Sequence, residues 1–126
     1  MTNPNLRNYA VNARSTDIHG RVLCNVRNHH FIVDGPVQNG APGEAVTPAE
    51  LFLTGIAACG VELVQSFAKA EGMPLRSIHV DITGMMDRAN PVRQDVSVMN
   101  SVRVRFDLTG VTAEQGHALI DRFKGR

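Results

Sequence analysis

The chain has 126 residues, the usual length of one domain, so we expect a single domain over residues 1–126. Its 13 basic and 12 acidic residues leave a formal net charge of +1, which argues against a nucleic-acid-binding protein with a basic face. Residues 1–15 lack the apolar run of a secretory signal. The longest uncharged stretch, residues 51–61, is shorter than the roughly 20 residues of a membrane span. We therefore expect a cytoplasmic protein that binds neither nucleic acid nor membrane.

Three β-strands are predicted in the first part of the chain. Residues 9–14 and 22–27 both alternate between two faces with a period of two. Asn28 tolerates a left-handed conformation, so we expect the chain to reverse there and residues 30–34 to pair back as a third strand. This pattern predicts an antiparallel meander. Residues 34–46, rich in glycine and proline, then form a loop that could cover or line a site.

The clearest predicted element is a long helix that begins at Thr47. Thr47 is followed by Pro48 at the first helical position and by Glu50 three residues later, which is the pattern of a capping box. The helix is expected to end before Gly72, which suits the left-handed position after a helix. Residues 51–61 are apolar on nearly every side, so this helix should be buried all round. A chain of this length covers such a helix most easily with the help of a second subunit.

Two further strands and a second helix are predicted after this long helix. Residues 78–83 alternate, and residues 96–108 carry apolar side chains at the even-numbered positions, with Asn100 as the single polar break. Thr112 and Gln115 repeat the capping-box pattern and open a helix. Its expected inward-facing residues are Leu119, Ile120 and Phe123. The resulting order, β-β-β-α-β-β-α, is typical of an α+β domain with antiparallel sheets.

Cys59 lies in the middle of the predicted long helix, with the small residues Ala57, Ala58 and Gly60 beside it. Small neighbours allow a backbone, a partner helix or a substrate to approach the thiol. A buried cysteine commonly serves as an apolar filler, whereas a reactive thiol needs a cation or a hydrogen-bond donor nearby. Because the helix N-terminus is three turns away, an arginine or histidine from elsewhere would have to supply that cation.

Residues 47–53 (TPAELFL), followed by Ala57-Ala58-Cys59, resemble the signature of the OsmC/Ohr superfamily, the osmotically inducible protein C and organic hydroperoxide resistance proteins. Residues 31–36 (FIVDGP), the glycine-rich loop and the order of elements also fit. The resemblance implies an OsmC-like α+β fold and an intertwined homodimer with the two long helices packed centrally. It also implies that Cys59 attacks an organic hydroperoxide and becomes a sulfenic acid. In active members a second cysteine resolves this acid as a disulfide, which a dithiol reductant then reduces.

The carboxylates of the predicted long helix are placed differently from those of the peroxidases of that superfamily. In the peroxidases a glutamate directly follows the motif proline, where this chain has Ala49. Glu50 comes one residue later and about 13 Å from Cys59 along the helix axis, so we expect it to serve as the cap. Glu62 lies on a closer face, and its alternative role is that of a surface charge or an ion-pair partner.

The second cysteine of the peroxidases lies just beyond their second helix, where this sequence ends at Arg126. We expect the sequence to be incomplete there, because the loss of the family's final strand would expose a sheet edge. The alternative is that this member lacks the two-cysteine chemistry. Cys24, the other thiol of the chain, shares its face with Val22 and Val26 and is expected in the core.

The activating arginine of the peroxidases comes from the N-terminal strand region of the partner subunit. Arg14 and Arg21 lie near that region, and Arg21, beside Gly20, is the better candidate for a thiolate partner. The alternative for both is a surface position. We expect no cofactor and no metal, because His29 and His30 are adjacent and point to opposite faces of a strand, and the other histidines are isolated.

The sequence therefore favours a redox stress protein, a thiol-dependent reductase of organic hydroperoxides that uses a dithiol reductant. Cys59 would be its nucleophile, in an apolar pocket at the interface of a homodimer. The alternative is a non-catalytic OsmC-like dimer that binds a small apolar ligand or has a structural role. That alternative follows from Ala49 and from the second cysteine that the sequence lacks beyond its second helix.

Overall fold

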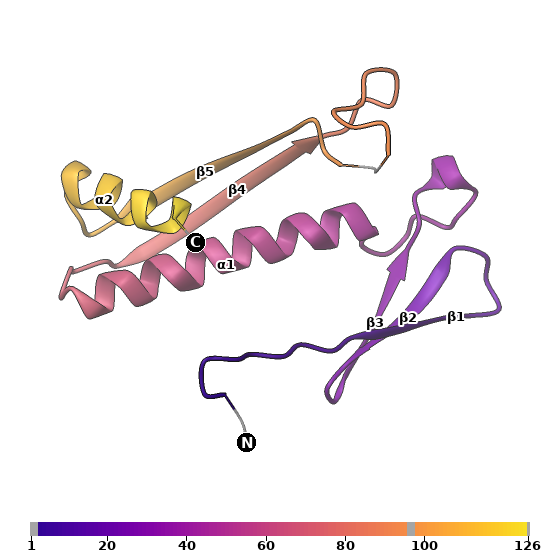
Figure 1. The fold of residues 1–126 in the computed structure, drawn as a ribbon, viewed down its shortest axis with the longest axis horizontal. Helices are drawn as coiled ribbons and strands as arrows, with labels where there is room; N and C mark the ends of the chain where they lie inside the picture. Colours follow the sequence, from indigo (N-terminus) through magenta and orange to yellow (C-terminus); the bar gives the residue numbers. More distant parts are fainter. Residues whose placement is uncertain (1–2, 96–97, 126) are drawn as a thin grey trace. The chain divides into compact units, whose positions relative to one another are not determined.

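The computed structural model describes residues 3–95 and 98–125. The chain divides into two compact units, Met1–Leu51 and Phe52–Arg126. The order of elements is β-β-β-α-β-β-α, with a short 3₁₀ helix at Val37–Asn39, so the predicted α+β class is confirmed (Figure 1). The expectation of a single domain stays a prediction.

The first unit contains an antiparallel meander of β1 (Asn12–Ser15), β2 (Arg21–Val26) and β3 (His29–Asp34). The turn between β2 and β3 was expected to use Asn28 as its left-handed residue, and this prediction is wrong. Arg27 takes the positive φ of 53° in the two-residue turn that joins Val26 to His29.

The first strand was expected to begin at Tyr9, but β1 begins at Asn12. Asn12 pairs with Asn25, so in the same register Tyr9 would lie opposite the turn, where no strand continues.

The first unit buries few of its apolar side chains. Among its described residues only Val33, Asp34 and Ala41 are buried, whereas Tyr9 is 85% and Val11 65% exposed. Cys24 pairs with Ala13 and Phe31 and is half-buried, as is every residue of β2. A three-stranded sheet with so little buried apolar surface needs a further surface to cover it.

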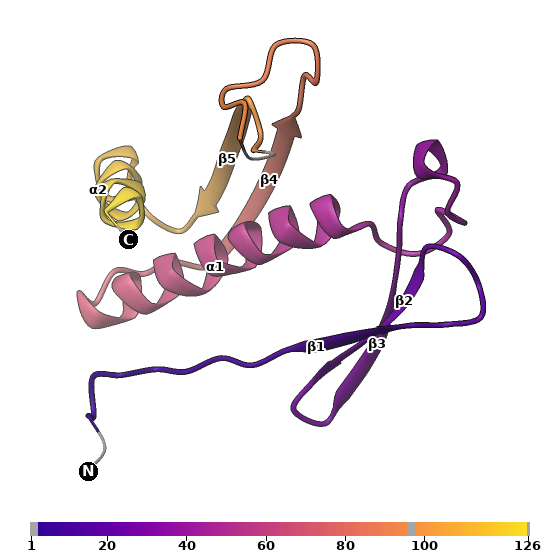
Figure 2. The same ribbon diagram turned by 45° about the vertical axis from the view of Figure 1, so that its right-hand side comes forward.

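The second unit is built from most of α1 (Pro48–Ala70), with β4 (Ser77–Met85), β5 (Ser101–Thr109) and α2 (Ala113–Lys124). β4 and β5 form a long antiparallel ribbon, and α2 lies beside the C-terminal half of α1 (Figures 1 and 2). The buried core joins the two helices, and the ribbon packs against it through Ile78, Phe106 and Leu108. The buried members of this core are Val64, Phe67, Ala68 and Leu119.

The second strand of the ribbon begins at Ser101, later than the predicted residue 96. Val96 lies outside the described residues, and Val98 is exposed and not in a strand. Asn100 was expected inside the strand as a polar break. Instead, its side-chain oxygen accepts a hydrogen bond from the Asp87 N–H at 2.7 Å, and its amide donates to the Asn90 carbonyl at 2.7 Å. These bonds hold the loop between β4 and β5. Asn100 therefore belongs to that loop, and the strand begins after it.

The long helix α1 is covered unevenly. Its buried residues, Gly60, Val64, Phe67 and Ala68, all lie in its C-terminal half, whereas Phe52 is 60% exposed. By length and composition α1 is the one described helix that could cross a membrane, but the core helix of a soluble protein passes the same test. A single chain therefore leaves the N-terminal half of this apolar helix without full cover.

We predict that Leu119→Ala lowers the free energy of unfolding by about 2–5 kcal/mol, because Leu119 is fully buried and its loss leaves a cavity. His117→Ala, an exposed position on the same helix, should change stability by less than about 0.5 kcal/mol. Urea unfolding followed by circular dichroism measures both. Equal losses for the two variants would contradict the placement of the core.

Candidate functional site

Cys59 is carried by a helix whose start is fixed by local hydrogen bonds. The backbone N–H of Thr47 donates to Glu50 Oε1 at 2.9 Å, and the Glu50 N–H donates back to Thr47 Oγ1 at 3.4 Å. The predicted capping box is therefore confirmed, and these bonds hold the pKa of the Glu50 carboxyl below its ordinary value. The helix ends at Ala70, and Gly72 has a φ of 66°, as expected for the residue that ends it.

The thiol of Cys59 faces an open apolar groove and is exposed in the single chain. The groove has a volume of about 460 Å³, and five of its lining residues follow one face of α1. They are Phe52, Gly55, Ile56, Cys59 and Leu63, and Phe123 of α2 completes the lining. Their spacing of three or four residues places them in one stripe about 16 Å long. In the single chain Cys59 is therefore not buried, and whether it acts as a filler or as a reactive thiol stays a prediction.

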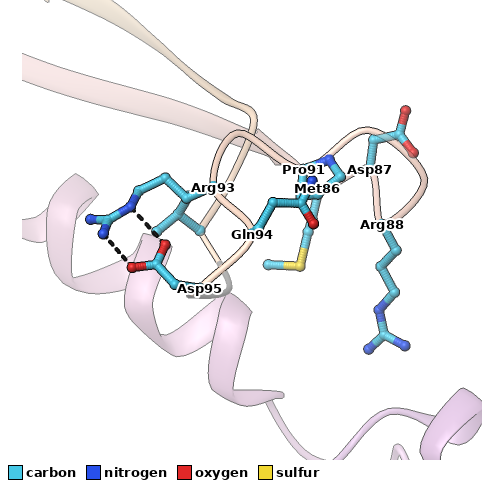
Figure 3. Close-up of a pocket in the computed structure, with 8 residues that line it drawn as sticks. Met86, Asp87, Arg88, Pro91, Arg93, Gln94 and Asp95 are labelled. Atoms are coloured by element: carbon cyan, nitrogen blue, oxygen red, sulfur yellow. Dashed lines mark hydrogen bonds and ion pairs between the residues drawn. The ribbon is translucent and has the colours of Figure 1, made fainter.

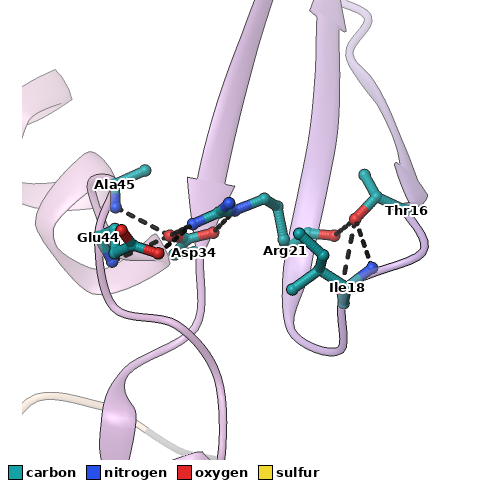
Figure 4. Close-up of polar contacts among 6 residues, drawn as sticks. All are labelled: Thr16, Ile18, Arg21, Asp34, Glu44 and Ala45. Carbon is teal, nitrogen blue, oxygen red and sulfur yellow. Dashed lines mark hydrogen bonds and ion pairs between the residues drawn. The ribbon is translucent and has the colours of Figure 1, made fainter.

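Arg21, the predicted thiolate partner, is bound to two carboxylates of its own unit (Figure 4). Its Nε and Nη2 atoms donate to Asp34 Oδ1 and Oδ2, both at 2.8 Å, which is a bidentate pair. Nη2 also donates to Glu44 Oε1 at 3.1 Å. The Asp34 side chain is fully buried, whereas the Glu44 side chain is 76% exposed. Arg21 thus has a clear local role, and its action on Cys59 stays a prediction.

Asp34 ties the glycine-rich loop to the sheet. Its Oδ2 atom accepts hydrogen bonds from the backbone N–H groups of Glu44 and Ala45, at 3.0 and 2.9 Å. The Arg21 guanidinium and these two N–H groups hold the pKa of the Asp34 carboxyl well below its usual range. The same bonds to Asp34 and Glu44 raise the pKa of Arg21, so this arginine stays charged.

The other residues singled out from the sequence take varied positions. Arg14 is exposed on β1, opposite Leu23 of β2. Glu62 is exposed, and its Oε1 accepts a hydrogen bond from Ser66 Oγ at 3.2 Å, so it behaves as a surface charge of the helix. Cys24 belongs to the first unit and Cys59 to the second.

A second hollow, of about 280 Å³, lies in the loop between β4 and β5 (Figure 3). Arg93 and Asp95, which line it, bond to each other, with Arg93 Nε 3.0 Å from Asp95 Oδ1. Figure 3 shows Arg88 pointing away from this pair. The charged side chains that line this hollow do not point toward a common centre, so we assign the hollow no chemistry. Within residues 3–95 and 98–125, no group of three His, Cys, Asp or Glu side chains could hold a metal ion.

The α+β fold is that of a known class of protein. The sequence model described as OsmC-like protein matches residues 41–126, well over half of the chain, and the chain therefore belongs to the OsmC-like family. A search of curated protein sequences gave no match.

Several solved structures have the same fold. An OsmC-like protein from Mycoplasma pneumoniae superimposes with a TM-score of 0.81 at 16% identity, covering 95% of this chain and 82% of the other. An organic hydroperoxide resistance protein from Elizabethkingia anophelis gives 0.77 at 18% identity, covering 97% and 84%. An organic hydroperoxide resistance protein OsmC from Legionella pneumophila gives 0.75 at 17% identity, covering 95% and 84%. At these identities the likeness shows the fold alone.

Sequence reasoning missed the roles of two residues. Asp34 stood in the motif that resembles the family, but its pairing with Arg21 did not follow from the sequence. The signal was available in the register, since a β2–β3 hairpin closed at residues 27–28 places Arg21 directly opposite Asp34. Phe123 was expected only as an inward-facing core residue, yet it also lines the Cys59 groove.

We predict that Asp34→Asn lowers the free energy of unfolding at pH 7. The variant should also lose less of this free energy than wild type when the pH is lowered. The folded-state pKa of Asp34 is depressed, so its contribution is complete above the unfolded-state pKa of about 3.9 and is lost as the pH falls below it. Urea unfolding at pH 7 and pH 3 measures the difference, which should shrink at pH 3. Asp121→Asn, with a 75% exposed side chain, is the matched control and should follow wild type. A constant difference at both pH values would contradict this role.

Proposed function

We propose that this protein is a thiol-dependent reductase of organic hydroperoxides and that Cys59 is its nucleophile. The observation that carries the proposal is the exposed Cys59 thiol in an apolar groove, on a chain of the OsmC-like family. Two of the solved structures with this fold are described as organic hydroperoxide resistance proteins, which supports the assignment. An apolar groove favours the organic substituent of a hydroperoxide over water and hydrogen peroxide.

The proposed reaction needs one protein thiol and a dithiol reductant. The Cys59 thiolate attacks the terminal peroxide oxygen, the O–O bond breaks and an S–O bond forms. The leaving alkoxide takes a proton and departs as the alcohol, while Cys59 becomes a sulfenic acid. One thiol of the reductant then displaces water from the sulfenic sulfur to give a mixed disulfide. Its second thiol breaks that disulfide, releases the oxidised reductant and restores Cys59. We place this reaction in the cytoplasm, where thiols are kept reduced.

We predict that the protein accelerates the loss of cumene hydroperoxide in the presence of dithiothreitol and that Cys59→Ser abolishes the acceleration. Serine keeps the size of the side chain but lacks the nucleophilic, oxidisable sulfur. Cys24→Ser, which removes the other thiol, should retain activity. The measurement is the rate of peroxide loss at equal protein concentrations. Equal rates for wild type and Cys59→Ser would overturn the proposal.

A non-catalytic OsmC-like dimer is the second candidate, and one observation favours it. The Arg21 guanidinium is occupied by Asp34 and Glu44, so it has existing partners to leave before it can serve a thiolate. In this case Cys59 should react with iodoacetamide no faster than an unstructured cysteine peptide. A markedly faster reaction would favour the reductase.

We also propose that the working form is a homodimer in which a second copy covers the N-terminal half of α1. The support is the exposure of Leu51 (37%) and Phe52 (60%), together with the thinly covered sheet of the first unit. The resemblance to the OsmC/Ohr superfamily implies the same arrangement. The Cys59 groove would then lie at the subunit interface.

We predict that Phe52→Asp shifts the protein from dimer to monomer, because it places a charge in an apolar contact. His79→Asp, whose side chain is 69% exposed on the polar face of β4, is the control and should leave the dimer intact. Size-exclusion chromatography with light scattering reads the mass directly. A monomeric wild-type protein would contradict the homodimer.

A further inference from the structure

We propose that Phe123 is a specificity-determining residue, whose ring forms the wall of the Cys59 groove that selects reagents with a bulky apolar substituent. This inference rests on the proposed reactivity of Cys59. Phe123 is the lining residue that comes from α2, whereas the other residues that line the groove belong to α1. The wall can therefore be altered without changing the helix that carries the thiol.

The Phe123 ring is held in place by a second aromatic ring. Its centroid lies 5.3 Å from that of Phe106 on β5, with an angle of 66° between the planes, which is an edge-to-face contact. Phe106 does not line the groove but packs against the buried core of the unit. Phe106 thus supports the wall from behind and restricts the orientation of Phe123.

Gly60, the residue after Cys59, allows these rings to lie close to α1. A Cβ atom at Gly60 would lie 3.2 and 3.3 Å from two atoms of the Phe106 ring and 3.6 Å from Phe123 Cζ. The two contacts to Phe106 are tighter than normal, whereas the one to Phe123 is an ordinary van der Waals contact, so a larger residue at Gly60 would push the Phe106 ring outward. Gly60 is buried, whereas Cys59, one position earlier on the helix, is exposed in the groove. Cys59 therefore exposes its thiol to the groove, while Gly60, without a side chain, leaves room for the rings of Phe106 and Phe123 to pack against the helix.

The chemistry of the lining predicts what the wall selects. Phe52, Ile56, Leu63 and Phe123 offer apolar contact and no charge to a ligand in the groove. An alkyl or aryl group beside the peroxide would bury surface against the Phe123 ring, and a small polar peroxide would not. Phe123 should therefore lower KM for bulky organic hydroperoxides and have little effect on small ones.

The groove can be probed through Cys59 without peroxide chemistry. The chain would carry Cys24→Ser, so that Cys59 is its single thiol, and would react with N-methylmaleimide and N-benzylmaleimide. The ratio of the two rates, divided by the same ratio for glutathione, measures the preference for the benzyl group. We expect a ratio well above one for this single-thiol protein, and a fall of about tenfold in Phe123→Ala, the scale of a lost apolar contact in a pocket.

Two further variants separate the wall from general stability. Gly60→Ala replaces no residue of the groove lining but displaces the Phe106 ring that supports Phe123, so it should lower the same ratio to an intermediate value. Phe67→Leu truncates a buried aromatic residue on the same helix that does not line the groove, and it should keep the wild-type ratio. Phe123→Leu, a milder change, serves if Phe123→Ala fails to fold. An unchanged ratio in Phe123→Leu or Phe123→Ala would overturn the proposal.

Peroxide turnover is measured separately, with cumene hydroperoxide and hydrogen peroxide as the large and small substrates. The expected result for Phe123→Ala is a higher KM for cumene hydroperoxide and an unchanged rate with hydrogen peroxide. If the single-thiol protein turns over neither peroxide, the proposed function fails while the maleimide ratios still test the wall. If it turns over both peroxides and the ratios do not change among the variants, the proposed role of Phe123 is wrong and the proposed reductase activity is supported.

Discussion

The structure depends on one constraint: α1 is apolar on nearly every side, and the rest of the chain covers only part of it. The residues of α1 that are buried begin at Gly60 and continue to Ala68, where β4, β5 and α2 pack against the helix. Before that point Phe52 remains 60% exposed. Burial of apolar surface is the main favourable term in folding and association, so the uncovered half of the helix is a strong driving force for assembly.

Cys59 lies at the point on α1 where the cover from this chain begins. Its neighbour Gly60 is buried under two aromatic rings, whereas the thiol itself is exposed. A thiol sealed inside the core would be inert, and one on a fully open helix would lack an apolar surface to bind an organic substrate. The boundary position gives Cys59 both access and an apolar surround, which is why the placement supports chemistry more than filling.

Much of the fold could be predicted because its signals are local. The capping boxes at Thr47 and Thr112 depend on residues three positions apart, and both are present in the structure. The errors fell where distant residues decide the outcome. The first strand does not extend back to Tyr9, because in its register that residue would lie opposite the turn after β2, and the last strand starts at Ser101, after Asn100, whose side chain bonds to the preceding loop.

The candidate site was predictable only in part, for the same reason. Cys59 was recognisable because its small neighbours lie beside it in the sequence. Phe123 was not recognisable as a wall of the groove, since its approach to Cys59 depends on the packing of α2 and on the support of Phe106. Periodicity identifies the inward face of a helix, but it does not identify which side chain across the core that face meets.

The Arg21–Asp34 pair sets a physical condition on any mechanism that uses Arg21. A buried carboxylate with a bidentate arginine and two backbone N–H groups is fully satisfied, and removing the cation would leave Asp34 charged, buried and short of a partner. Arg21 can therefore help a thiolate only with a donor that it does not use on Asp34. Within the part of the chain that the structure describes, its Nη1 atom makes no hydrogen bond or ion pair, and a guanidinium carries five N–H donors in a fixed fork. Asp34 and Glu44 thus fix the direction of the guanidinium and leave Nη1 as the atom for another acceptor, so the pair orients the arginine and does not use up all of its donors.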